Sequence, residues 1–210
     1  MSIEDIYVKN VYNKIAKEFD NTRYSVWACV KSFLEDIPKE SIIGDIGCGN
    51  GKNMMYRKDC INIGCDFSEE FVKICNDKNL NVVYGDVLNL PFETDKFDYT
   101  ICIAVLHHLS TLEKRKKAIS ELVRVTKPGS HILIMVWAIE QPEDSKRKFT
   151  KQENLVEWKG PLGNVGRNGK NIEERYYYVF KKGELDELVQ GYEILNSFYE
   201  RGNWCIIIKA

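Results

Sequence analysis

Apolar residues recur along this chain with two alternating periods. Short apolar runs rich in β-branched residues predict five buried strands, at about 42–46, 61–65, 81–84, 97–103 and 131–137. Apolar residues spaced three and four apart predict helices before and between the strands, at about 4–19, 24–34, 69–77 and 111–126. Strands and helices that alternate in this way are typical of an α/β protein with a doubly wound parallel sheet.

The final part of the chain predicts a hairpin. A helix at about 182–190 precedes strands at 192–199 and 204–208, which are separated only by the turn Arg-Gly-Asn at 201–203. A connection this short joins antiparallel strands, so the last strand should run against the others. We therefore predict seven strands in a single domain over residues 1–210, with two N-terminal helices in residues 1–36 that lie over the ligand-binding site.

The segment 138–175 breaks this regular pattern. It holds four of the 14 glycines and few apolar residues, and it is too long to be a plain connection. We expect a mobile insertion. Residues 143–182 carry ten Lys and Arg against six Asp and Glu, although the whole chain has a net charge of −1. The chain is therefore not a uniformly basic nucleic-acid binder, but it holds a local basic segment.

A glycine-rich turn follows the first predicted strand. Gly47, Gly49 and Gly51 alternate with other residues, and Asp45 stands two positions before the first of them. Alternate glycines let the backbone turn tightly and approach a ligand, and the free N–H groups of a helix expected at 51–57 would point into the turn. An acid here suits a cationic amino-acid ligand better than a pyrophosphate. The stretch resembles the first motif of class I S-adenosylmethionine-dependent methyltransferases; the alternative is an ordinary glycine turn.

Two further acids end the next two predicted strands. Asp66 lies 21 positions after Asp45, close to the spacing of roughly 20 at which an acid receives ribose hydroxyls. Phe67 beside it is placed to stack on a base, and Asp86 ends the third strand. Both acids have a simpler interpretation as caps of strand ends.

The cysteines and the lack of targeting signals indicate the cellular compartment of the protein. The seven cysteines form no Cys-x-x-Cys pair, which predicts reduced thiols, no disulfide framework and no metal site. There is no apolar run of 18 residues and no secretory signal at the start. We expect an intracellular protein, cytoplasmic with the nucleus as a possible second location.

Motifs along the whole chain resemble those of the eukaryotic tRNA wobble-uridine carboxymethyl methyltransferases. The glycine turn and the Leu-His-His-Leu run mark only the superfamily, whereas Thr-Arg-Tyr at 22–24, Trp-Ala-x-Glu-Gln at 137–141 and Gly-Asn-Trp at 202–204 are much more specific; Arg-Tyr-Tyr-Tyr-Val-Phe at 175–180 also belongs to the resemblance. Glu157 and Tyr178 depart from the pattern, since relatives tend to have proline and histidine there. These departures affect the details expected of the tRNA-facing loop.

The resemblance implies a class I, Rossmann-like sheet with strand order 3-2-1-4-5-7-6 and S-adenosylmethionine as cofactor. It also implies tRNA as substrate and a small zinc-binding activator protein as partner. The cofactor contacts that it implies are Asp45, Gly47, Cys48, Gly49, Asp66, Phe67, Asp86, Val87 and Ile103. In the inferred order, the third strand lies at an edge without lysine or proline, so we expect the activator to pair near Val82 to Tyr84.

The implied reaction methylates a carboxylate, which is already ionised at neutral pH because its pKa is near about 4. No general base is required, and no Asn-Pro-Pro-Tyr motif of amino-group methyltransferases follows the fourth strand. Arg23, His107 and His108 are the candidates to hold the carboxylate, loosely enough to keep it nucleophilic. Arg23 has an alternative as an exposed charge, and a histidine as a packing or capping residue.

Two other functions remain open at this point. A small-molecule methyltransferase of the ubiquinone-biosynthesis type would share the glycine turn and the histidines, but it has no use for a basic insertion. A catalytically idle scaffold that binds the cofactor and the partner would share every motif, so only an assay separates it from an enzyme.

Overall fold

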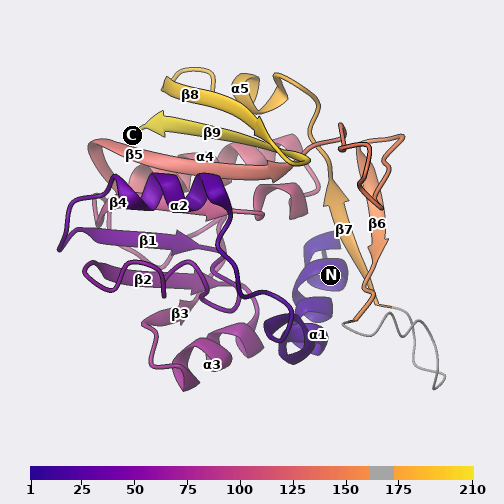
Figure 1. The fold of residues 1–210 in the computed structure, drawn as a ribbon, viewed down its shortest axis with the longest axis horizontal. Helices are drawn as coiled ribbons and strands as arrows, with labels where there is room; N and C mark the ends of the chain where they lie inside the picture. Colours follow the sequence, from indigo (N-terminus) through magenta and orange to yellow (C-terminus); the bar gives the residue numbers. More distant parts are fainter. Residues whose placement is uncertain (161–172) are drawn as a thin grey trace.

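The computed structural model describes residues 1–160 and 173–210, and in them a seven-stranded sheet forms the centre of the fold (Figure 1). The strand order is β3-β2-β1-β4-β5-β9-β8, and β9 runs antiparallel to both of its neighbours. The predicted fold class and strand order are therefore confirmed, with β8 and β9 as the predicted sixth and seventh strands. The strands are β1 (Ile42–Ile46), β2 (Ile61–Asp66), β3 (Val82–Tyr84), β4 (Phe97–Ile103), β5 (Thr126–Trp137), β8 (Glu193–Glu200) and β9 (Asn203–Lys209).

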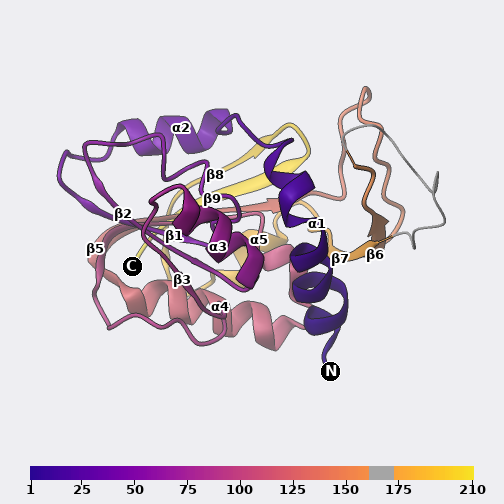
Figure 2. The ribbon, with the colours of Figure 1, turned by 90° about the horizontal axis from the view of Figure 1, so that it is seen from below.

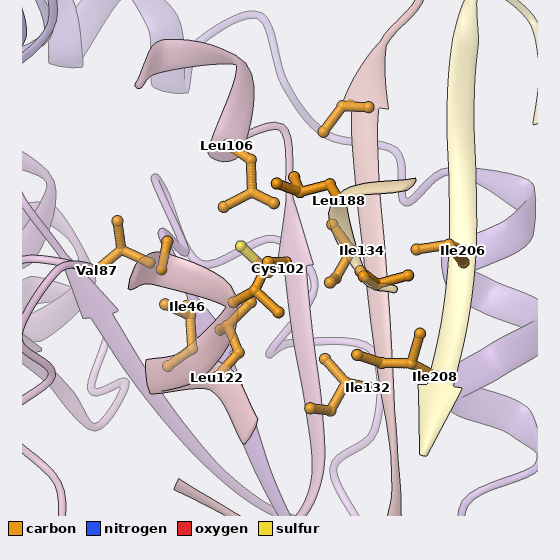
Figure 3. Close-up of a cluster of buried hydrophobic side chains, with 14 of the residues drawn as sticks. Ile46, Val87, Cys102, Leu106, Leu122, Ile132, Ile134, Leu188, Ile206 and Ile208 are labelled. Atoms are coloured by element: carbon orange, nitrogen blue, oxygen red, sulfur yellow. The ribbon is translucent and has the colours of Figure 1, made fainter. Parts of the chain in front are cut away.

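The two faces of the sheet bury alternate strand residues. Ile46, Cys102, Ile134 and Ile206 pack with Leu122 on one face, as Figure 3 shows. Their neighbours in sequence on β4, β5 and β9 belong to a second buried cluster on the opposite face. This alternation follows from the period of two in a strand, and it explains why the central strands are apolar on both sides.

Helices cover both faces of this sheet. The helix α2 (Ala28–Glu35) lies on one face, and α4 (Leu112–Val125) lies on the other (Figure 2), where α5 (Glu184–Leu188) joins the same cluster. Thr111 caps α4 by accepting the N–H of Lys114, and Ser68 caps α3 (Glu69–Asp77) by accepting the N–H of Phe71. Within residues 1–160 and 173–210, none of the helices has the length and apolar character needed to cross a bilayer.

The helix expected at 51–57 is wrong, because these residues form successive turns. Gly51 has a φ of +75°, outside the helical region, so this residue cannot form the first turn of a helix. The helix expected at 24–34 starts only at Ala28, after an extended stretch. The helix expected at 4–19 is divided into the π-helical turn η1 (Asp5–Lys9) and α1 (Asn10–Asp20).

The segment 138–175 is not wholly irregular, because it contains one strand and the start of another. β6 (Glu153–Glu157) and β7 (Glu174–Tyr178) pair as a separate antiparallel sheet, which lies beside α1 at one end of the molecule (Figures 1 and 2). Part of the predicted insertion, residues 161–172, lies outside the described residues. The mobility of the insertion stays a prediction.

Candidate active site

A cavity of about 1070 Å³ opens where the parallel strands β1, β2 and β4 reach their carboxyl ends. Residues of η1, α1 and β7 form its other walls, so the N-terminal segment and the insertion both enclose it. Helix α2 contributes only Ala28, because it packs on the sheet face instead. The predicted site residues that line the cavity are Arg23, Gly47, Cys48, Gly49, Asp66, Phe67, Asp86, Val87, Ile103, His107 and His108. Asp45 does not line it.

The glycine turn brings backbone to the edge of the cavity. Gly47 and Gly49 have φ values of +73° and +55°, a region that disfavours other residues. A Cβ on Gly47 would lie 2.2 Å from Cγ2 of Val105, whereas a Cβ on Gly49 would meet no protein atom within 4 Å. A side chain at position 49 would therefore occupy the space left for a ligand.

Asp66 holds this turn in place and keeps part of its carboxylate free. Oδ2 accepts the N–H of Gly49 at 2.7 Å, and Oδ1 accepts the N–H of Ser68 at 2.8 Å. Removal from bulk water raises the pKa of the Asp66 carboxyl to about 6, so the group is mostly ionised at neutral pH. A carboxylate accepts about four hydrogen bonds, and the remaining sites suit the two hydroxyls of a ribose.

Asp45 lies behind the wall of the cavity, with 2% of its surface exposed. Neither carboxylate oxygen has a hydrogen-bond partner in the part of the chain that the structure describes. Burial raises the pKa of Asp45 to about 7. A buried carboxylate without partners is costly, and a donor from a bound ligand or water would satisfy it. Its contact with a cofactor stays a prediction.

The expected base-stacking residue has a neighbour that the sequence did not reveal. Phe67 stacks with Tyr84 at 6.2 Å between ring centroids, and the Lys9 ammonium lies 5.3 Å and 4.9 Å from the two rings. Lys9 also donates to the Tyr84 hydroxyl at 3.1 Å and pairs with Glu69 at 3.0 Å. A base that stacks on Phe67 would therefore lie close to a fixed positive charge.

Two hydrogen bonds fix the proton positions on the adjacent histidines, which form the short turn η2 (Leu106–His108). The N–H of Trp137 donates to Nδ1 of His107 at 3.0 Å, so the proton of that neutral ring is on Nε2. Nδ1 of His108 donates to the carbonyl of Tyr176 at 2.7 Å, and its Nε2 accepts the hydroxyl of Tyr12 at 3.0 Å.

Burial keeps both rings neutral. It holds the pKa of His107 well below its ordinary value and lowers the pKa of His108 to about 3. Only the Nε2–H of His107 lacks an acceptor among the hydrogen bonds of residues 1–160 and 173–210. His107 is thus the histidine with a free donor in the cavity.

Four arginines line the same cavity, namely Arg23, Arg147, Arg175 and Arg201, and the sequence analysis singled out only Arg23 for catalysis. Arg23 donates to the carbonyl of Thr22 at 3.2 Å and lies 5.1 Å from the ring of Phe19. Arg147 is exposed and lies 4.1 Å from the ring of Trp137, and Arg175 is buried in β7. The sequence held one indication for Arg175: it stands two residues before Tyr177, so the two side chains lie on the same face if the segment forms a strand.

The chain is similar to known methyltransferases at the level of sequence. Residues 44–134 match a methyltransferase domain family. A tRNA (carboxymethyluridine(34)-5-O)-methyltransferase of Schizosaccharomyces pombe is 38% identical over 98% of this chain and 97% of its own length. An Arabidopsis thaliana protein of the same name is 49% identical over 76% of this chain, but the match covers only 40% of that relative, and 41% of a Xenopus tropicalis relative.

Solved structures show the same fold. A Methanosarcina mazei SAM-dependent methyltransferase superposes with a TM-score of 0.68 at 18% identity, over 88% of this chain and 98% of that one. A putative methyltransferase from Haloferax volcanii, solved in complex with a methyltransferase activator, gives 0.64 at 16% identity, over 100% and 97% of the two chains.

Proposed function

Because the chain belongs to the family of tRNA (carboxymethyluridine(34)-5-O)-methyltransferases, we propose that it methylates the carboxylate of a carboxymethyluridine at the tRNA wobble position. S-adenosylmethionine is the methyl donor and the product is the methyl ester. One observation carries the proposal: a single cavity joins the glycine turn and Asp66 to four arginines and a histidine with a free donor. One part suits a nucleoside cofactor and the other suits an anion.

The described residues fit S-adenosylmethionine. Asp66 has free acceptor sites for ribose hydroxyls, and Gly49 leaves open space beside the backbone. Asp45 is an orphaned acid, which suits a ligand that carries an ammonium group. The cofactor, when bound, supplies a methyl group on a sulfonium. The carboxylate held by this chain's residues would accept that methyl, and the electron pair of the bond between sulfur and methyl would stay on sulfur.

The protein's part in this reaction is to hold and orient the carboxylate. No proton has to leave the nucleophile, since a carboxylate is ionised at neutral pH. The histidines are neutral and so are suited to donate a hydrogen bond rather than to form a strong ion pair. We assign the Nε2–H of His107 and the guanidinium of Arg23 to the positioning of the carboxylate. His108 supports them through Tyr12.

The runner-up function, a small-molecule methyltransferase of the ubiquinone-biosynthesis type, is not favoured. The tRNA methyltransferase of S. pombe matches 98% of this chain, including the segment 138–175.

The segment 138–175 holds Lys146, Arg147 and Lys148, and we propose that it contacts the tRNA backbone.

A partner is proposed at the edge strand β3. Its residues Val83 and Tyr84 are 38% and 46% exposed, and among the strands of residues 1–160 and 173–210, β3 pairs only with β2. An uncovered strand edge is a site for strand addition. The Haloferax volcanii neighbour was solved with a methyltransferase activator, and we propose that a small zinc-binding activator adds a strand here.

Nucleoside mass spectrometry tests the function. The protein, with its activator and isotope-labelled S-adenosylmethionine, is incubated with tRNA that carries carboxymethyluridine. We expect the labelled methyl ester to appear at the wobble position and the acid to disappear in equal amount. An unchanged level of the acid, with cofactor binding intact, would refute the activity and leave the idle scaffold as the explanation.

A further inference from the structure

Arg175 is a buried cation without an anion. It is 4% exposed, and it lines the cavity. Its Nη2 lies 3.5 Å from the carbonyl oxygen of Glu157, at the limit of a hydrogen bond, and its buried Nε has no acceptor in the described chain. A guanidinium remains charged in proteins, so its burial without a partner is costly.

No carboxylate of the chain is available to neutralise it. The ion pairs of residues 1–160 and 173–210 do not include Arg175. Residues 161–172, which the structure does not describe, contain neither aspartate nor glutamate. The missing negative charge must therefore come from a bound molecule.

Aromatic rings hold this guanidinium without neutralising it. Its Cζ lies 5.9 Å from the ring of Tyr12, 5.1 Å from Trp158 and 5.3 Å from Tyr177. These rings come from α1, from the residue after β6 and from β7, which lie side by side in Figure 1. Ring faces attract a cation but accept no strong hydrogen bond, so the donors that are not directed at the Glu157 carbonyl stay available to a ligand.

The chemistry of the neighbouring groups distinguishes two kinds of ligand. Arg175 offers donors only, and His107 offers its Nε2–H in the same cavity. A carboxylate presents acceptors alone and matches them. The corresponding amide has one acceptor and an NH₂ group that would face further donors, and it brings no charge to the buried cation.

We propose that Arg175 is the specificity residue of this site, an inference that rests on the proposed function: it binds the carboxylate of the modified uridine and selects the acid over the corresponding amide. Arg175 neutralises the carboxylate at one oxygen, Arg23 and His107 help to orient it, and the other oxygen keeps lone pairs for the methyl group. The amide leaves the cation unpaired, and a hydrogen bond to a charged group accounts for a discrimination of about tenfold to a hundredfold.

The chain offers a matched control in Arg115. It is also buried, at 5% exposure, and its guanidinium lies 3.7 Å from the ring of Tyr178, the next tyrosine of β7. Arg115 donates to the carbonyl of Leu109 at 2.8 Å and does not line the cavity. Its replacement therefore removes a buried, ring-stacked arginine without touching the proposed anion site.

The test measures binding of two anticodon stem–loop RNAs, one with carboxymethyluridine at the wobble position and one with its carbamoylmethyl amide. The full chain is used with its activator and with S-adenosylhomocysteine. The ratio of the two dissociation constants is compared for the wild type, Arg175→Gln, Arg175→Lys and Arg115→Gln. Circular dichroism and cofactor affinity report whether each variant is folded.

We expect the wild type and Arg115→Gln to prefer the acid by at least about tenfold. Arg175→Gln should bring the ratio close to one, and Arg175→Lys, which keeps the charge but not the planar fork, should lower it at least about threefold. If Arg175→Gln does not fold, the lysine variant decides. If either folded Arg175 variant shows the same ratio of dissociation constants as the wild type, the inference is wrong. The proposed function still holds in that case if the wild type forms the ester. A wild type that forms no ester overturns both.

Discussion

His108 donates its Nδ1–H to the carbonyl oxygen of Tyr176 at 2.7 Å, and this bond ties the turn after β4 to strand β7. Tyr12 of α1 donates to the other ring nitrogen at 3.0 Å. His108 therefore connects three elements that enclose the cavity, whereas His107 beside it keeps a free Nε2–H. The two histidines are neighbours in sequence, but they have different tasks.

This difference predicts different defects for the two alanine variants. His107→Ala should lower turnover by about tenfold to a hundredfold, since a hydrogen bond to a charged group is lost, and should leave cofactor affinity within about twofold. His108→Ala should instead lower the free energy of unfolding by about 2 kcal/mol, because the buried carbonyl of Tyr176 loses its donor and the Tyr12 hydroxyl loses its acceptor. Single-turnover assays, calorimetry and thermal unfolding separate the two effects. Equal losses of turnover at equal stability would contradict the assignment.

The glycine turn allows a similar separation. Gly49→Ala places its Cβ in open space, so the variant should fold at a cost of about 1–2 kcal/mol for its left-handed φ, yet lose cofactor affinity at least about tenfold. Gly183→Ala is the matched control. It too has a positive φ and open space around the added carbon, but it lies at the start of α5 outside the cavity.

Calorimetry with S-adenosylhomocysteine and thermal unfolding check both variants. We expect similar losses of stability and a loss of affinity only at position 49. Normal affinity in Gly49→Ala would mean that the cofactor does not approach the backbone there.

The sequence could predict the parts of this site that depend on short-range patterns, and not the parts that depend on contacts between residues far apart in the chain. The strand order, the turn at Gly47 and Gly49, and the place of Asp66 follow from apolar period, turn chemistry and the rule that parallel strands end at one edge. The helix expected at 51–57 is absent: Gly51 has a positive φ, a backbone state that hydrophobic period does not reveal, and residues 52–56 form turns.

The roles of Arg175 and Tyr12 could not be predicted, because they depend on where β7 lies. Tyr12 meets His108 across 96 positions of sequence, and His108 meets Tyr176 across 68. β7 pairs with β6 and not with the central sheet. The local sequence pattern therefore does not predict which wall of the cavity this pair of strands forms. The same holds for the proton positions on the histidines, which are set by distant partners.

Asp45 gives a prediction with a defined pH dependence. Its folded-state pKa is raised from 3.8 to about 7, so ionisation at high pH destabilises the folded protein, and the cost disappears as pH falls towards 4. Asp45→Asn should therefore raise the free energy of unfolding at pH 8 by about 1–2 kcal/mol, after allowance for the unpaired amide, and by much less near pH 4.5.

The same substitution should weaken cofactor binding at least about tenfold, since the orphaned acid is predicted to receive a cationic ligand. Thermal unfolding at the two pH values and calorimetry measure the two effects in one preparation. A variant that is less stable than the wild type at pH 8 would show that the carboxylate has partners in the folded protein after all.

The last prediction concerns the free groups of the edge strand β3. The carbonyl of Asn81 and the N–H of Gly85 bond to β2, at 2.8 Å and 3.0 Å. The backbone N–H and C=O groups of successive residues in a parallel strand point to opposite neighbours. Val83 therefore bonds to β2, as Asn81 and Gly85 do, and the N–H groups of Val82 and Tyr84 face away from the sheet. An activator strand on this edge would pair with these two amides and not with Val83.

Amide hydrogen exchange measured residue by residue by NMR, with and without the activator, tests this pattern. The Val82 and Tyr84 amides should exchange at least about tenfold more slowly in the complex, because each gains a backbone hydrogen bond. The opposite edge strand, β8, is the internal control, and its outward amides should keep their rates. Protection that appears on β8 instead, or equally on both edges, would place the activator elsewhere or reduce the effect to general stabilisation.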